Sequence, residues 1–208
     1  VNMNYAAVGA GGNAVVKVEV PAEWANIVVK EEEHTADAAR PDFVKKIVDP
    51  INALKGDLLP VSAFNGREDG TWDNGTAAYE KRGIAVNVPE WKIGNCIQCN
   101  QCAYVCPHAV IRPFLATEEE AAASGVEWKQ GLGETKEYKF RIQISPMDCT
   151  GCSNCVDVCP AKDKALVMRP LEEQMPQQKN WDYITKNIGY KQVVDKTKSV
   201  KNLQFAQP

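Results

Sequence analysis

Residues 96–107 read Cys96-Ile97-Gln98-Cys99-Asn100-Gln101-Cys102-Ala103-Tyr104-Val105-Cys106-Pro107, and residues 149–160 read Cys149-Thr150-Gly151-Cys152-Ser153-Asn154-Cys155-Val156-Asp157-Val158-Cys159-Pro160. Both stretches have the spacing C-x2-C-x2-C-x3-C-P, and together they contain all eight cysteines of the chain. This spacing is typical of bacterial iron–sulfur proteins. It predicts two 4Fe–4S clusters, and it predicts that the surrounding chain folds around them.

The spacing has a physical reason. Three cysteines at steps of three let a short loop wrap one side of a cube, with its backbone N–H groups directed at the sulfides. The fourth cysteine lies about one helical turn further on and is directed away from that cube. In two-cluster ferredoxins this cysteine ligates the other cluster. We therefore assign cluster one to Cys96, Cys99, Cys102 and Cys159, and cluster two to Cys149, Cys152, Cys155 and Cys106.

Three other interpretations of the cysteines remain open at this point. A structural zinc site favours paired C-x2-C knuckles rather than three evenly spaced cysteines followed by Cys-Pro. Disulfides require an oxidising compartment. Unligated cysteines in the core are the third possibility. The doubled motif favours iron–sulfur clusters over all three.

Composition narrows the class of protein. The 208 residues allow one or two small domains. The net charge is -3, and the sequence has no basic stripe of the kind that binds nucleic acid. No apolar run is long enough to span a membrane, and the residues from Val1 onward do not have the basic and apolar pattern of a signal peptide, so none is expected. We expect a cut or processed piece of a protein from a reducing, anaerobic cytoplasm, with neither nucleic acid nor membrane as a partner.

The segment before the first motif divides into two parts. Residues 1–40 are expected to be the tail of a preceding domain and a charged linker over 30–40, with a helix end, a glycine turn at 9–12 and a strand at 15–20. Residues 41–90 are expected to form a small α+β linking domain. Its expected elements are a helix over 43–51 that Pro50 breaks or kinks, an extended segment over 58–64, turns over 65–76, a helix from Thr76 to Arg82 and a strand over 84–88.

Residues 91–170 are expected to form a two-cluster ferredoxin-like domain. A short apolar strand follows each Cys-Pro, over 109–113 and 165–170. Between the motifs we expect an inserted helix from Thr117, with a capping box to Glu120 and an end at Gly125, and then an inserted strand over 138–144. Residues 171–208 lose clear periodicity, have few apolar residues at core spacing and are expected to be a wrapping arm that leads to a missing domain. The expected fold class is α+β.

Several stretches resemble one family. The family is pyruvate:ferredoxin oxidoreductase, also called pyruvate synthase. Its small linking domain is named for the residues Glu-Lys-Arg. Residues 61–64, 68–71 and 79–85 resemble this domain, and they include Glu80, Lys81 and Arg82. Its ferredoxin-like domain is similar to residues 88–91, 96–102, 106–113 and 148–152. The resemblance covers most of 41–208, and residues 1–25 resemble the end of the preceding domain.

The resemblance implies a function for the chain. In that family pyruvate and coenzyme A become acetyl-CoA and carbon dioxide on thiamine diphosphate, and a third cluster passes electrons through two ferredoxin-like clusters to external ferredoxin or flavodoxin. This sequence has no cysteines for the third cluster and no thiamine or pyruvate module. The resemblance therefore implies an electron-transfer module that carries no catalytic residue, whereas thiamine diphosphate, magnesium and the third cluster belong to the rest of the enzyme.

Two alternatives come from other classes of protein. One is a free-standing ferredoxin-type carrier, and the other is an interaction domain that the clusters only stabilise. A carrier has no evident need for a Glu80-Lys81-Arg82 unit, for which ion pairing or an inter-domain contact is the expected role. The sequence does not indicate which 2-oxo acid is used, the cluster potentials or the oligomeric state.

Overall fold

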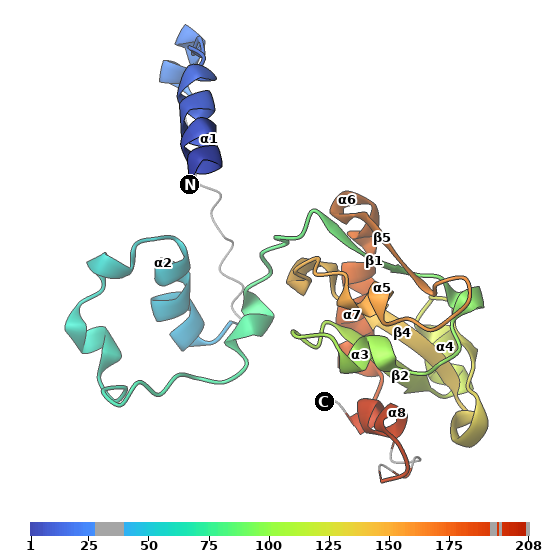
Figure 1. Ribbon diagram of the computed structural model, residues 1–208. Helices are drawn as coiled ribbons and strands as arrows, with labels where there is room; N and C mark the ends of the chain where they lie inside the picture. Colours follow the sequence, from blue (N-terminus) through green and yellow to red (C-terminus); the bar gives the residue numbers. More distant parts are fainter. Residues whose placement is uncertain (28–39, 192–194, 196, 207–208) are drawn as a thin grey trace. The chain divides into compact units, whose positions relative to one another are not determined.

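The computed structural model describes residues 1–27, 40–191, 195 and 197–206 (Figure 1). The chain divides into two compact units, residues 1–71 and 72–208, which are described separately. Most of the predicted linker over 30–40 lies outside the described residues. No helix in the described ranges has both the length and the apolar character needed to cross a bilayer.

The first unit opens with α1 (Asn2–Asn13) and a 3-10 helix over Ala22–Asn26. The predicted glycine turn is wrong, because α1 continues through residues 9–12. Glycine costs about 1 kcal/mol relative to alanine inside a helix, but it does not forbid one. The predicted strand at 15–20 is also wrong: these residues have no regular structure, and their valines are exposed. Alternation alone cannot form a strand that has no partner to pair with.

The predicted helix after Pro41 is present and includes a π-helix over Val44–Val48 followed by α2 (Asp49–Asn52). Val44, Ile47 and Val48 are buried, as their spacing predicted. Pro50 does not break the helix. The Asp49 N–H donates to the Val44 oxygen, five residues back, and this wider turn gives space to a residue that lacks an N–H.

Two 3-10 helices, over Gly56–Leu58 and Val61–Phe64, replace the extended segment that the sequence predicted for 58–64. Turns follow over 65–75, as the Asn-Gly and Asp-Gly pairs predicted. The second unit begins with a 3-10 helix over Thr76–Tyr79. It is shorter than the helix predicted to reach Arg82, and Gly75, in the left-handed conformation, occupies its cap instead of Thr76.

Two antiparallel sheets organise the second unit. One pairs β1 (Asn87–Trp91) with β5 (Leu166–Pro170), and the other has the order β2 (Ile111–Ala116), β4 (Lys139–Ile144), β3 (Lys129–Gln130). The strands predicted after each Cys-Pro are β2 and β5. The strand predicted over 84–88 begins only at Asn87, and Ala85 and Val88 are buried while Ile84 and Val86 are exposed.

The region between the motifs contains the helix and the strand that the sequence predicted there. Helix α4 (Glu118–Ala123) starts with a complete capping box between Thr117 and Glu120, and Gly125 follows it with φ +66°. On β4, Phe140, Ile142 and Ile144 are buried in the core with Ile111 of β2. Arg141 and Gln143 on the opposite face are buried as well, so β4 is covered on both sides.

The predicted lack of core residues after 170 is wrong. Helices α6 (Leu171–Gln174), α7 (Pro176–Asn187) and α8 (Val200–Leu203) follow β5. Trp181, Ile184 and Ile188 are buried, and Phe205 packs edge-on against Phe140 with ring centroids 6.1 Å apart. Trp181 and Ile184 of α7 and Ile188, the residue after its end, recur at i, i+3 and i+7, which is the spacing of one helical face.

The role of α7 in the core yields a stability prediction. Ile184→Ala should lower the free energy of unfolding by about 2–5 kcal/mol, because Ile184 is fully buried against Ala116, Ala121 and Ile188. Urea unfolding followed by circular dichroism measures this loss. The matched control is Leu203→Ala, since Leu203 is about half exposed and its truncation should cost far less. Equal losses for the two variants would contradict the packing described for α7.

Candidate metal centres

The eight cysteines are free thiols that line two separate cavities. Cavity one is lined by Cys96, Cys99, Cys102 and Cys159. Cavity two is lined by Cys106, Cys149, Cys152 and Cys155. Each cavity therefore takes three cysteines from one motif and the fourth from the other, which is the grouping that the spacing predicted.

The electrostatics of the thiols reflect this grouping. Burial, followed by repulsion from Cys149, Cys106 and Cys152, raises the pKa of Cys155 to about 12. Burial, followed by the charges of Cys96, Cys155 and Cys99, also raises the pKa of Cys102 far above its ordinary value. Because Cys102 is affected by Cys155 of the other set, the two cavities are close neighbours. Thiolates in these places need compensating positive charge, which bound iron would supply.

The two cysteine loops share an unusual backbone. Gln98 and Asn100 have φ near +59° in the first loop, and Gly151 and Ser153 have φ of +71° and +65° in the second. These residues flank the second cysteine of each motif at the same two positions. A left-handed residue at each position curls the loop around its cavity, as a cluster-binding loop requires.

Gly151 cannot be replaced without strain. A Cβ atom there would lie 2.9 Å from the Asn87 oxygen, in addition to the cost of a positive φ. Its N–H donates to the sulfur of Cys149 at 3.4 Å, and the Ala165 N–H donates to the sulfur of Cys159 at the same distance. Such bonds stabilise a thiolate. The backbone thus contributes to both cavities.

The third cysteine of each motif lies on a short helix. Cys102 lies on α3 (Gln101–Tyr104), and Cys155 lies on α5 (Asn154–Asp157). Each helix ends within a turn, so the fourth cysteine of the motif, Cys106 or Cys159, is delivered beyond it to the other cavity. The strands β2 and β5 then lead the chain away.

The donor set fits a cube. Among the described residues, no three His, Cys, Asp or Glu side chains are placed to share a single metal ion. The cysteines surround a space instead, as ligands at the corners of a 4Fe–4S cube do. Cavity one also has two buried polar atoms without a protein hydrogen-bond partner, Trp91 Nε1 and Asn100 Oδ1, on residues that line it. Unpaired buried groups of this kind are rare without a bound group or water.

Two polar residues inside the first motif fix its loop, and sequence reasoning missed both. Gln98 is fully buried; its amide donates to the Gln130 oxygen at 2.7 Å and accepts from the Leu132 N–H at 3.0 Å. The Asn100 amide donates to the Lys201 oxygen at 3.1 Å. The first loop is therefore tied to β3 and to the C-terminal segment. Gln98 and Asn100 occupy positions between the cysteines of the motif, and a single sequence gives no signal that distinguishes such positions.

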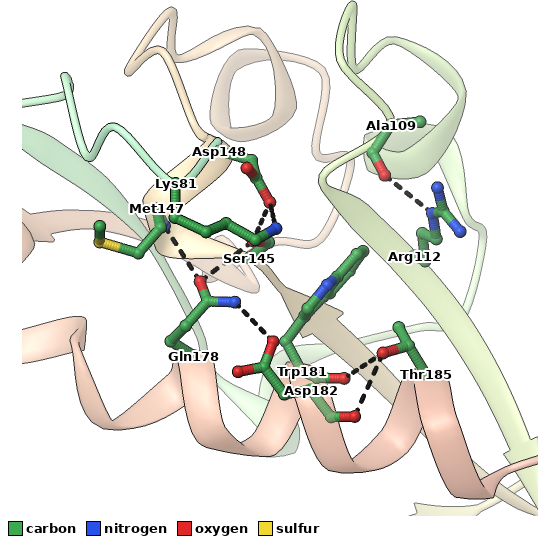
Figure 2. A network of polar contacts seen from close by, with 10 residues as sticks. All are labelled: Lys81, Ala109, Arg112, Ser145, Met147, Asp148, Gln178, Trp181, Asp182 and Thr185. Atoms are coloured by element: carbon green, nitrogen blue, oxygen red, sulfur yellow. Dashed lines mark hydrogen bonds and ion pairs between the residues drawn. The ribbon is translucent and has the colours of Figure 1, made fainter. Parts of the chain in front are cut away.

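A different network, part of which Figure 2 shows, holds the residues that directly precede the second motif. Lys81 forms an ion pair with Asp148, directly before Cys149. The Ser145 hydroxyl donates to the same carboxylate and lies 3.1 Å from the Gln178 side-chain oxygen of α7, which accepts from the Met147 N–H at 3.2 Å. The neighbouring Glu80 and Arg82 also pair with each other. The ion pairing expected of Glu80, Lys81 and Arg82 is therefore present.

Two further residues near the motifs, His108 and Trp128, differ in their surroundings. His108 lines cavity two and is exposed to solvent. Trp128 packs beside Ala116, Ala121 and Ile184, and its Nε1 donates to Ser124 Oγ at 2.8 Å. Trp128 thus has a packing role, and it lies among core residues rather than along a cysteine cavity.

Comparison with known proteins agrees with this geometry. Residues 95–162 match the family model described as a 4Fe-4S dicluster domain, and residues 29–85 match the EKR model, described as a domain of unknown function. The chain contains a 4Fe-4S dicluster domain. Along its whole length it is 48% identical to the pyruvate:ferredoxin oxidoreductase of Moorella thermoacetica and 47% identical to the pyruvate-flavodoxin oxidoreductase of Enterobacter agglomerans. It is also 42% identical to the mitochondrial pyruvate dehydrogenase [NADP(+)] of Euglena gracilis.

The chain is thus a relative of the pyruvate:ferredoxin and pyruvate-flavodoxin oxidoreductases, and the resemblance drawn from the sequence is confirmed. It spans 18% of the length of the Moorella and Enterobacter proteins and 11% of the Euglena protein. The similarity therefore concerns one segment of much longer proteins.

The exchange of cysteines between motifs can be tested by counting iron in paired variants. Cys106→Ala and Cys149→Ala should each leave about 4 iron per chain, since each removes a ligand of cluster two. Combining them should again leave about 4, whereas Cys106→Ala with Cys96→Ala should leave close to none. Iron and sulfide analysis under anaerobic conditions gives the counts. If Cys106→Ala with Cys96→Ala keeps about 4 iron, both residues serve one cluster and the assignment is wrong.

Proposed function

We propose that this chain is the electron-transfer segment of a pyruvate (2-oxo acid):ferredoxin oxidoreductase. It would carry electrons from thiamine-dependent decarboxylation through two 4Fe–4S clusters to an external ferredoxin or flavodoxin. The observation that carries the proposal is the pair of adjacent cavities, each lined by four cysteines drawn from both motifs. The names of the relatives supply the reaction.

The residues of each cavity have separate tasks. Each cluster, when bound, accepts and releases one electron. The thiolates of Cys96, Cys99, Cys102 and Cys159 would hold cluster one, and those of Cys149, Cys152, Cys155 and Cys106 would hold cluster two. Apolar neighbours exclude water, namely Ile142 and Leu166 at cavity one and Val110 and Ile111 at cavity two. A dry site favours a defined redox centre because solvent exposure changes cluster potentials.

The short separation of the two sites supports electron transfer rather than a purely structural role. Cys102 of the first set and Cys155 of the second interact electrostatically, and they lie on the neighbouring helices α3 and α5. A fold that used metal only for stability would not need two centres side by side. Electrons can therefore enter at one cluster and leave from the other.

The remaining chemistry would lie elsewhere in the parent enzyme. Thiamine diphosphate, magnesium, a third cluster and the substrate site are assigned to other domains, in a cytoplasmic enzyme. Residues 1–40 would then end a preceding domain, 41–90 would form the linking domain, 91–170 the ferredoxin-like domain with its inserted helix and strand, and 171–208 would lead onward. Exposed apolar side chains in the first unit support neighbouring polypeptide: Val15, Val16, Val18, Val20, Leu54 and Val61.

A free-standing ferredoxin-type carrier is the second candidate. It is favoured by the packing of residues 171–205, where Trp181, Ile184 and Phe205 close the core of the second unit. A carrier needs such a self-contained fold. The exposed valines at 15–20 and the relatives' greater length favour the module.

Cluster content is the first test of the proposal. The chain prepared without oxygen should contain about 8 iron and about 8 acid-labile sulfide, because each set of four cysteines suits one cube. Dithionite reduction should produce the EPR signals of two interacting reduced clusters. Iron and sulfide analysis, with zinc measured on the same sample, decides the result. A preparation that contains only zinc and remains EPR-silent would overturn the proposal.

Activity is the second test. The isolated chain should accept electrons from a low-potential donor and pass them to an added ferredoxin or flavodoxin, since both clusters lie within it. It should not reduce either acceptor with pyruvate, coenzyme A and thiamine diphosphate, because it has no thiamine or substrate module. Anaerobic visible spectroscopy follows both reactions. The control is a chain with Cys96→Ala and Cys106→Ala, which should do neither. Pyruvate-dependent reduction by the chain alone would contradict the module.

A further inference from the structure

Two lysines contact the cysteine segments that line cavity one. Lys129, the first residue of β3, donates through Nζ to the Ile93 oxygen at 2.9 Å and to the Cys96 oxygen at 2.7 Å. Lys164 donates to the Val156, Asp157 and Cys159 oxygens at 3.0, 3.0 and 2.8 Å. Each ammonium group therefore lies at the backbone of a cysteine of the same set, one at its first member and one at its last.

These contacts follow from the shape of the loops. A loop that turns N–H groups inward leaves carbonyl oxygens directed outward, and a lysine can bind several of them at once. Lys164 also binds the last carbonyls of α5, where a positive charge is favourable. The lysines thereby place two positive charges just behind the ligand backbone of cavity one.

Neither charge is neutralised nearby. In the part of the chain that the structure describes, no carboxylate lies within ion-pairing distance of Lys129 or Lys164. Cavity two is arranged differently, because Lys81 is paired with Asp148. Arg112, near Cys106, donates to the Ala109 oxygen at 2.9 Å and lies over the Trp181 ring at 5.3 Å. Cavity two therefore also has a positive charge near one of its cysteines, that of Arg112 near Cys106, and the two cavities differ in how the neighbouring charges are arranged.

We propose that Lys129 and Lys164 raise the reduction potential of cluster one by holding two positive charges behind its ligand segments. The inference rests on the proposed function, in which Cys96, Cys99, Cys102 and Cys159 hold that cluster. Reduction adds one electron to the cluster while no bond forms or breaks. Nearby positive charge stabilises that added negative charge, and its effect is large where the protein keeps the dielectric constant low.

The test is a redox titration followed by EPR on chains that hold cluster one alone, made in a Cys149→Ala background. Lys129→Gln and Lys164→Gln keep a side-chain donor and remove the charge. Each should lower the ratio of reduced to oxidised cluster one at a fixed potential by roughly threefold or more. The effects should add in the double variant, since the lysines bind different segments. Lys129→Arg and Lys164→Arg, which keep the charge, should titrate like the parent chain.

Two controls separate this effect from a general loss of charge or structure. Lys139→Gln removes a lysine that binds Glu118 and the Gln130 side chain and that contacts no cysteine segment; it should leave the titration unchanged. In a Cys96→Ala background, which leaves cluster two, Lys129→Gln should shift the potential much less. Thermal unfolding of each variant checks that the fold is intact.

The outcomes are distinct. An unshifted titration in variants that retain about 4 iron would overturn the inference and leave the proposed function standing. If Lys129→Gln loses its iron, the titration of Lys164→Gln tests the inference instead. Lys164 is exposed, so its substitution disturbs no buried contact. An unshifted titration of Lys164→Gln would then also overturn the inference. A parent chain that binds no cluster at all would overturn the proposed function itself.

Discussion

The structure depends on one constraint: each cavity takes its fourth thiol from the other motif. Cys159 must reach the cavity of Cys96, and Cys106 must reach the cavity of Cys149. The segments around the motifs serve this exchange. The β1–β5 pair joins the entry to the first motif with the exit from the second, and β2–β4 joins the exit from the first with the entry to the second. Because each half completes the other's site, neither cavity forms without both.

The two cavities are related in backbone but not in support. Their loops share left-handed residues at matching positions, whereas the side chains that hold them differ. Gln98, Asn100 and Lys129 tie the first loop to β3 and to the C-terminal segment. The second loop depends on Asp148, which Lys81 and Ser145 bind, and on Gln178 from α7. Segments outside the repeat therefore brace it, and they give two similar sites unequal surroundings. Unequal surroundings are what let two chemically alike clusters differ in potential.

The sequence predicted what local chemistry determines. Eight cysteines at fixed spacing define the two sets, and Thr117 with Glu120 marks the start of α4. Prediction from the sequence failed where contacts between residues far apart in the chain determine the structure. The valines at 15–20 alternate, but no strand pairs with them. Helix α7 is rich in glutamine, lysine and asparagine, and only Trp181, Ile184 and Ile188 mark its buried face. The roles of Gln98 and Asn100 arise from partners at Gln130 and Lys201, which no local pattern reveals.

The two units differ in how completely they bury their apolar residues, and this difference bears on function. In the second unit Phe140, Ile142, Leu166 and Ile184 are almost fully enclosed, so the region that would hold the clusters has its own core. In the first unit Val15, Val16, Leu54 and Val61 are largely exposed. Leaving such side chains in water forgoes about 25 cal/mol for each Å² of apolar surface. A self-sufficient redox region joined to a segment that gains stability from further contacts suits one part of a longer enzyme. An independent carrier would have little use for that exposed surface.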